Sequence, residues 1–258
     1  MTVTSKHRSA WVRGGTAVTA NSASDAATQA GLNWTIRTAP LMAESTPLLI
    51  DSEGVTPATY IDVPKKQGII REDNNSVIGI VGTKYKVVQN MEVFNALDTL
   101  VDAGDARYAA AGEFNGGANI WMVLELPQGI NVANDPHAAF LLVKTSHDGS
   151  SSVVIKPIIE RLFCANQVNG LISNKNGNRN RKYNEYTYRM THSTNQELSI
   201  ADIRNITNLT YTAIADYQLV ANNLMQKNMT REQTLNFFKQ VWALPSTVED
   251  KPYELLTR

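Results

Sequence analysis

Two apolar strands joined by a tight turn fill residues 138–158, and no other stretch constrains the fold as strongly. The turn is Asp148-Gly149-Ser150, where aspartate bonds to nearby backbone and glycine tolerates a positive φ. A second pair, RYAAAGEF and NIWMVLELP, is joined by Asn115-Gly116-Gly117, which has similar turn chemistry. Strands linked by such short turns pair antiparallel, so the sequence predicts an antiparallel β-meander.

Helices are expected where apolar residues recur every three to four positions behind a capping residue. They span 24–31, 91–103 and 200–226, with one more beginning after Thr230, and their expected caps are Ser24, Asn90, Ser199 and Thr230. Further strands are expected from Trp34 onward, at 47–50, 57–63 and 76–81, and as an edge strand within 183–191.

These elements predict an α+β fold, an antiparallel β-meander with a packed helix, followed by a C-terminal long-helix region. A content of 43% apolar and 19% charged residues is enough for a sizeable core. We divide the chain into an N-terminal arm at 1–21, an α+β core domain at 22–192 and a C-terminal helical region at 193–258. The arm lacks periodicity, so we expect it to be flexible or ordered only by a partner.

Charge is distributed unevenly, although the formal net charge is zero. Residues 89–135 contain seven acidic side chains and one basic, whereas residues 136–192 contain eight basic and three acidic. A basic segment of this kind favours an anionic partner. The N-terminus lacks a secretory apolar region and no 18-residue apolar run occurs, so a cytoplasmic protein without a membrane partner is expected.

The segment from Asn174 to Arg189 combines cations with tyrosines. Lysine and arginine neutralise phosphates, and tyrosine rings stack on unpaired bases, which together predict nucleic-acid binding. The expected nucleic-acid-binding residues are Lys156, Arg161, Lys175, Arg179, Arg181, Lys182, Tyr183, Tyr186, Tyr188 and Arg189. The alternative is a solvated loop leading into an edge strand whose tyrosines face the core, with Lys156 and Arg161 as ordinary surface charges.

The turn between the two strands of 138–158 is a second candidate contact. Its residues His147, Asp148, Gly149 and Ser150, with the hydroxyls that follow, are expected to touch a DNA backbone or a neighbouring subunit through backbone N–H groups. The alternative is turn chemistry alone. The phosphate-binding pattern GxxxxGK[ST] is absent.

No standard catalytic, metal or cofactor motif occurs, since CxxC, HExxH and GxGxxG are all missing. We therefore expect a non-enzymatic protein without cofactor or metal. The catalytic alternative is Cys164 as nucleophile with His147 as its base. A lone cysteine between Phe163 and Ala165 is more typical of packing, and it also excludes an intrachain disulfide.

Five motifs in order resemble one family: AGLNWTI, GIVGTKYKVVQN, the helix with Phe94 and Leu97, YAAAGEFNGGANIWMVLELP, and TSHDGSSSVVIKPIIERLFCAN. The family is the phage/plasmid-like proteins of unknown function found in prophages, conjugative plasmids and phages. The resemblance covers roughly residues 14–220. A histidine–threonine pair typical of the family stands here in reversed order, as Thr191-His192.

The resemblance implies a setting among DNA-replication and recombination genes of mobile elements. The order of a helix and two hairpins is also similar to phage single-strand annealing proteins, in which a ring or filament of subunits holds DNA in a basic groove. We therefore expect an oligomeric single-stranded-DNA-binding protein of a phage or plasmid, a strand-annealing or recombination factor in the host cytoplasm. The alternative is a structural or interaction protein, either a virion component or a host-takeover factor. A hydrolase using Cys164 or clustered carboxylates is the third hypothesis.

Overall fold

The computed structural model describes residues 14–51, 54–127, 130–132, 135–158, 186–192 and 200–242. The chain forms two compact units, Met1–Gln218 and Leu219–Arg258. Antiparallel sheets combine with several helices, so the expected α+β class is confirmed.

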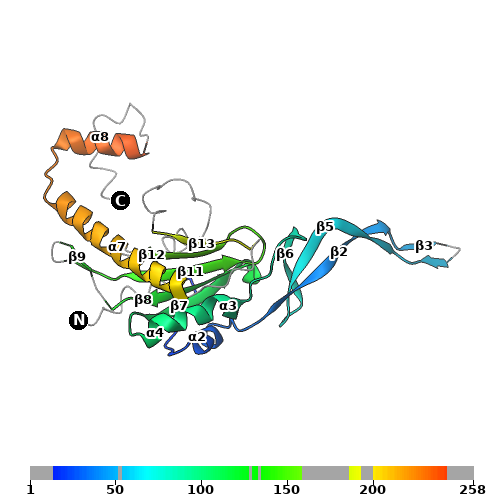
Figure 1. Cartoon of the computed structure of the whole chain (residues 1–258). Coiled ribbons are helices and arrows are strands. Elements are labelled where there is room, and N and C mark those ends of the chain that lie inside the picture. The colour runs from blue at the N-terminus through cyan, green and yellow to red at the C-terminus, as the bar shows by residue number, and fades with distance from the viewer. Residues whose placement is uncertain are drawn as a thin grey trace. The chain divides into compact units, whose positions relative to one another are not determined.

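A six-stranded antiparallel sheet is the centre of the first unit. Its order is β1 (Thr16–Ala17), β7 (Arg107–Phe114), β8 (Asn119–Glu125), β11 (Phe140–Ser146), β12 (Val153–Ile158) and β13 (Tyr188–Met190) (Figure 1). Both expected hairpins are present, as β7–β8 and β11–β12, and β13 is the expected edge strand. The central strands β8 and β11 are almost entirely buried, so they form the core of the sheet.

The segment expected to be an N-terminal arm contributes the other edge of this sheet. β1 pairs antiparallel with β7 through Thr16–Ala111 and Ala17–Ala110. Two residues are too few for an apolar pattern to be visible in the sequence, and the pairing comes from the tertiary fold.

The helix predicted at 24–31 is α2 (Ala23–Gln29), and its N-cap is Ser22 instead of the expected Ser24. The side-chain oxygen of Ser22 accepts a hydrogen bond from the backbone N–H of Asp25. Three short elements replace the helix predicted at 91–103: α3 (Asn90–Phe94), the 3₁₀ turn η1 (Asn95–Leu97) and α4 (Asp98–Asp102).

The N-cap of α3 is Gln89, not the expected Asn90, because the Asn90 side chain points into the core. The backbone N–H of Gln89 donates to the Glu92 carboxylate, and the Gln89 amide pairs with both backbone groups of Ile36. The start of α3 is thereby attached to the strand that follows Trp34 in the chain.

A second, three-stranded sheet has the order β2 (Ile36–Thr46), β5 (Thr59–Arg71) and β6 (Ser76–Gly82). Two small hairpins, β3 (Leu49–Asp51) with β4 (Gly54–Thr56) and β9 (Ile130–Val132) with β10 (Asp135–His137), complete the strands. The expected runs at 47–50, 57–63 and 76–81 therefore overlap real strands, and β5 is considerably longer than its sequence pattern indicated.

The long helix predicted over 200–226 is α7 (Ile200–Met225), and the division between the two units falls within it, after Gln218. In the second unit, α8 (Arg231–Trp242) begins at the predicted Thr230 cap. The Thr230 hydroxyl accepts from the Gln233 N–H, and the Gln233 side chain accepts from the Thr230 N–H, which is a capping box. Among the described helices, none has the length and apolar character needed to span a bilayer.

Candidate functional site: a cationic sheet face

Three cations from three neighbouring strands lie on one face of the six-stranded sheet. Lys144 on β11 is paired directly with Val154, and Val154 is paired with Arg189 on β13. Lys156 lies two residues along β12 from Val154. Directly paired residues, and residues two apart on a strand, share a face, so all three cations point the same way. We call Lys144, Lys156 and Arg189 the cationic face.

Exposure increases across the cationic face toward the edge of the sheet. Lys144 is only 6% exposed, Lys156 is half-buried and Arg189 is exposed. Burial, followed by the charges of Lys156 and Arg189, lowers the pKa of Lys144 to about 8. The positive charges of Lys156 and Arg189 therefore act on Lys144, and an anion placed beside Lys144 would offset them.

The sequence prediction identified Lys156 and Arg189 but omitted Lys144. Lys144 lies within the apolar run AAFLLVKTS, where sequence periodicity suggests only a buried strand. One signal could have identified it. Lys144 and Lys156 lie on either side of the predicted hairpin turn, at spacings that place both side chains on the same face of the hairpin.

Tyr186 and Tyr188 contact α7 instead of the cationic face. The Tyr186 hydroxyl donates a hydrogen bond to Asp216, and burial together with Asp202 raises the pKa of Tyr188. Tyr188 and Arg189 are adjacent on β13, so their side chains point to opposite faces of the sheet. The other predicted nucleic-acid contacts lie outside the described residues: Arg161, Lys175, Arg179, Arg181, Lys182 and Tyr183, as does Cys164.

The turn at 147–150 is stabilised by its own side chains. The Asp148 carboxylate accepts from the Ser150 N–H, and Gly149 has a φ of +76°, which only glycine adopts readily. The Ser146 hydroxyl accepts from the Ser151 N–H and donates to the Ser151 carbonyl. Several polar groups of this loop thus have hydrogen-bond partners within the turn itself, as the interpretation of this segment as a turn predicts.

His147 differs from the rest of this turn because its side chain is completely buried. The Asn90 amide donates to the carbonyls of Leu32 and Trp34, so its oxygen must accept from His147 Nε2, 2.9 Å away. That arrangement fixes the neutral tautomer with hydrogen on Nε2. Burial, with a smaller effect of His192, lowers the pKa of His147 to about 4.

A second buried histidine lies close to the same end of β11. His192 Nε2 is 3.2 Å from the Thr145 hydroxyl, and the His192 ring stacks on Tyr85 at 4.8 Å between centroids. The Tyr85 hydroxyl donates to the Ser146 carbonyl. Burial lowers the pKa of His192, so both histidines are neutral near pH 7 and act as structural hydrogen-bonding groups.

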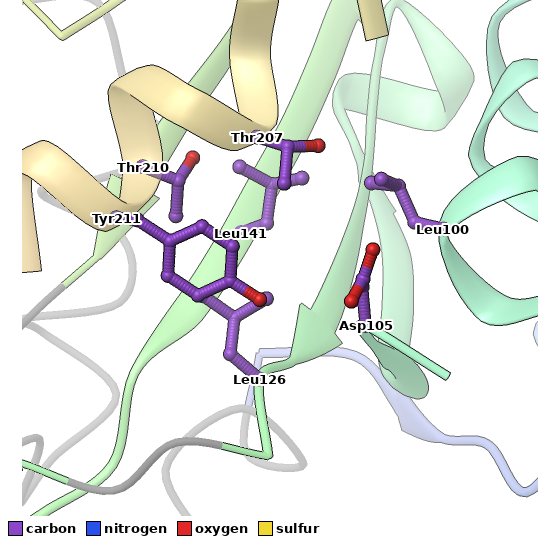
Figure 2. Close-up of a pocket in the computed structure, with 7 residues that line it drawn as sticks. All are labelled: Leu100, Asp105, Leu126, Leu141, Thr207, Thr210 and Tyr211. Atoms are coloured by element: carbon purple, nitrogen blue, oxygen red, sulfur yellow. The ribbon is translucent and has the colours of Figure 1, made fainter. Parts of the chain in front are cut away.

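A small hollow lies between the six-stranded sheet, α4 and α7. Its lining residues are Leu100, Asp105, Leu126, Leu141, Thr207, Thr210 and Tyr211 (Figure 2). The space among these side chains is about 230 Å³ even with the open solvent at its mouth included, which is below the roughly 300–1,000 Å³ typical of small-molecule sites. Within the described part of the chain, no group of three or more His, Cys, Asp or Glu side chains is positioned to hold a metal.

The fold and site together define an α+β protein that is built on an antiparallel meander and carries a cationic sheet face. The sequence model of a family described as "Domain of unknown function (DUF932)" matches residues 77–256. This match covers more than half of the chain, which therefore belongs to the DUF932 family. It includes α7 and α8 and begins within β6, later than the start of the motif resemblance. No curated protein and no solved structure matches the chain.

Proposed function

We propose that this protein binds single-stranded DNA as a homo-oligomer and acts in strand annealing or recombination for a phage or plasmid. The observation that supports binding is the cationic face, where Lys144, Lys156 and Arg189 project from three adjacent strands. Cations so arranged neutralise phosphates and release their counterions, which makes nucleic-acid binding favourable at low salt.

The gradient of exposure suggests a division of roles within the cationic face. Arg189 at the sheet edge is exposed and makes the direct phosphate contact, with Lys156 beside it. Lys144 is buried and strengthens the positive potential beneath them. Annealing involves no covalent chemistry, because base pairing supplies the free energy, and the proposal accordingly needs no cofactor or catalytic residue.

Reversing the two outer charges should weaken binding of a 30-nucleotide oligothymidylate. For Lys156→Glu/Arg189→Glu we expect an affinity loss on the order of tenfold or more at low salt. The slope of log affinity against log salt should also become shallower by about 1.4, or roughly 0.7 per lost phosphate contact. Fluorescence anisotropy over a salt series measures both quantities.

The matched control is Lys227→Glu/Arg231→Glu, which reverses two exposed cations in the second unit. Its affinity and slope should stay close to those of the unmodified protein. Equal losses for both variants would indicate a general charge effect, and a salt-independent affinity would contradict the proposal itself.

Binding should also depend on pH through Lys144. An anion favours the charged ammonium, and the pKa of Lys144 in the free protein is about 8, so affinity should fall as pH rises through 8. Titration calorimetry at pH 8 in buffers of different ionisation enthalpy should detect proton uptake on binding. The variant Lys144→Met should show weaker binding without this uptake, and unchanged uptake would exclude Lys144 as its source.

The second candidate function is a structural or interaction protein, such as a virion component or host-takeover factor. The observation that favours it is the set of exposed large apolar side chains between Met42 and Ile80. Loss of assembly with intact DNA binding after reversal of the cationic face would support this candidate over the first.

A further inference from the structure

Part of the β2–β5 hairpin is a two-stranded ribbon. β6 pairs with β5 only from Lys66 to Arg71, whereas β2 continues to pair with β5 through Met42–Asp62, Ala43–Ile61 and Glu44–Tyr60 (Figure 1). We call residues 42–46 and 59–62 the distal ribbon. A two-stranded ribbon is marginally stable in water unless something packs against it.

One face of the distal ribbon is acidic. The directly paired residues Met42 and Asp62 share a face, and Glu44 and Tyr60, each two positions away, share it too. All four side chains are exposed, with Met42 at 54% and Tyr60 at 56%. We call these four residues the acidic distal face.

The opposite face of the same sheet is basic where β6 joins it. Arg37 and Val77 both pair with Ile70, Ile80 pairs with Gly68, and alternation along β5 places Lys66 with them. Arg37 and Lys66 are exposed, and Val77 and Ile80 are 62% and 52% exposed. We call Arg37, Lys66, Val77 and Ile80 the basic outer face.

The two faces point in opposite directions. Arg37 and Met42 are an odd number of residues apart on β2, so their side chains alternate to opposite sides. The register shift between them lies on β5. Pro40 and Met42 are two positions apart on β2, whereas their partners Gln67 and Asp62 are five positions apart on β5, so β2 keeps its regular alternation. The extra residues of β5 include Lys65, whose φ is +60°.

Many large apolar side chains of this sheet and of the adjoining β3–β4 hairpin are exposed. Eight large apolar side chains between Met42 and Ile80 are more than half exposed: Met42, Leu48, Ile50, Val55, Tyr60, Ile61, Val77 and Ile80. Divided among the two faces and the β3–β4 hairpin, they concentrate far more exposed apolar side chains in this part of the chain than the single scattered ones of an ordinary surface. Such a surface normally packs against a partner.

We propose that the acidic distal face of one copy packs on the basic outer face of the next copy of this chain. Each face offers two charges of one sign beside two exposed apolar side chains, so the faces complement one another. The formal net charge is zero, so no long-range repulsion opposes self-association. This inference rests on the proposed function and identifies the surface through which the homo-oligomer would form.

The contact joins two different surfaces, so it is heterologous and continues from copy to copy into a ring or a filament. Pairing of the β5 edge with another strand is disfavoured, because Pro64 lacks an N–H group and the irregularity at Lys65 interrupts β5. The two sheets meet face to face instead.

A complementation experiment tests the contact. Variant A is Glu44→Lys/Asp62→Lys and variant B is Arg37→Glu/Lys66→Glu, each of which gives both faces the same sign. We expect each variant alone to be monomeric by light scattering and sedimentation at concentrations where the unmodified protein assembles. An equimolar mixture of A and B should assemble again, since every contact then joins opposite charges.

The control Lys227→Glu/Arg231→Glu should assemble normally, and circular dichroism of A and B should match the unmodified protein. A monomeric unmodified protein overturns the inference, as does assembly that persists in A and B. Failure of the mixture to assemble when A and B are folded and monomeric overturns it as well. Oligothymidylate binding by monomeric A separates this inference from the nucleic-acid proposal, which fails only if the cationic face does not bind.

Discussion

Replacing Trp121 by alanine should lower the free energy of unfolding by about 3–5 kcal/mol, the cost typical of removing a buried aromatic side chain. Trp121 is completely buried in β8, and its ring stacks on Phe114 with centroids 6.4 Å apart. Urea denaturation followed by circular dichroism measures the loss. A decrease below about 1 kcal/mol would show that this part of the core is not well packed.

The contact of Trp121 with glycine provides a sharper test by double-mutant cycle. A Cβ atom on Gly112 would lie 2.8 Å from Cζ2 of Trp121, and one on Gly15 would lie 2.5 Å from the same atom. Gly112→Ala should therefore cost about 1–3 kcal/mol in the unmodified protein and far less in Trp121→Ala. Additive effects would mean that the ring is not the obstacle.

Acidification from pH 6.5 to pH 4 should remove about 3 kcal/mol of stability through His147 alone. The unfolded chain protonates this histidine near pH 6.5, whereas burial lowers the folded-state pKa to about 4. Between these values the unfolded state binds more protons, so stability falls as pH falls. The lowered pKa of His192 acts in the same direction.

The comparison variant for this pH dependence is His147→Gln, whose amide can still donate to Asn90 but does not titrate. Urea denaturation of both proteins at several pH values isolates the contribution of His147 from that of the carboxylates. The difference between the two proteins should narrow steadily from pH 6.5 to pH 4. A constant difference would show that His147 is not buried in the neutral form.

The hairpins were predictable from the sequence because their signals are local. The turn residues at 115–117 and 148–150 have the conformations that their chemistry favours, with φ of +65° at Gly116 and +76° at Gly149. The capping box of Thr230 with Gln233 is local in the same way. In these cases the residues that make the signal are also the residues that form the structure, so no distant contact has to be foreseen.

The positions that sequence reasoning misplaced are those decided by tertiary contacts. Asparagine is a favoured N-cap residue, yet the Asn90 amide links the carbonyls of Leu32 and Trp34 to His147. The N-cap of α3 is Gln89 instead. Two carbonyls from a segment more than fifty residues away outweigh a local preference for capping.

The candidate site was predictable only in part, for a related reason. Lys156 and Arg189 stand out as charges in the sequence, but Lys144 joins them only once β11, β12 and β13 are in register. Tyr186 and Tyr188 were predicted to stack on bases from spacing alone, whereas α7 supplies carboxylates to both. Contacts of this kind, between a strand and a helix elsewhere in the chain, produce no periodic pattern in the sequence.

The pairing of β1 with β7 has a practical consequence for expressing pieces of this chain. A fragment cut where the family match begins, at Val77, would lose the strand that protects one border of the six-stranded sheet. It would also lack the backbone at Gly15, which packs against the indole of Trp121, and the carbonyls of Leu32 and Trp34, which accept hydrogen bonds from Asn90. Such a truncation should aggregate, because the family match omits the first 76 residues of the compact unit Met1–Gln218 and leaves the edge of β7 unpaired.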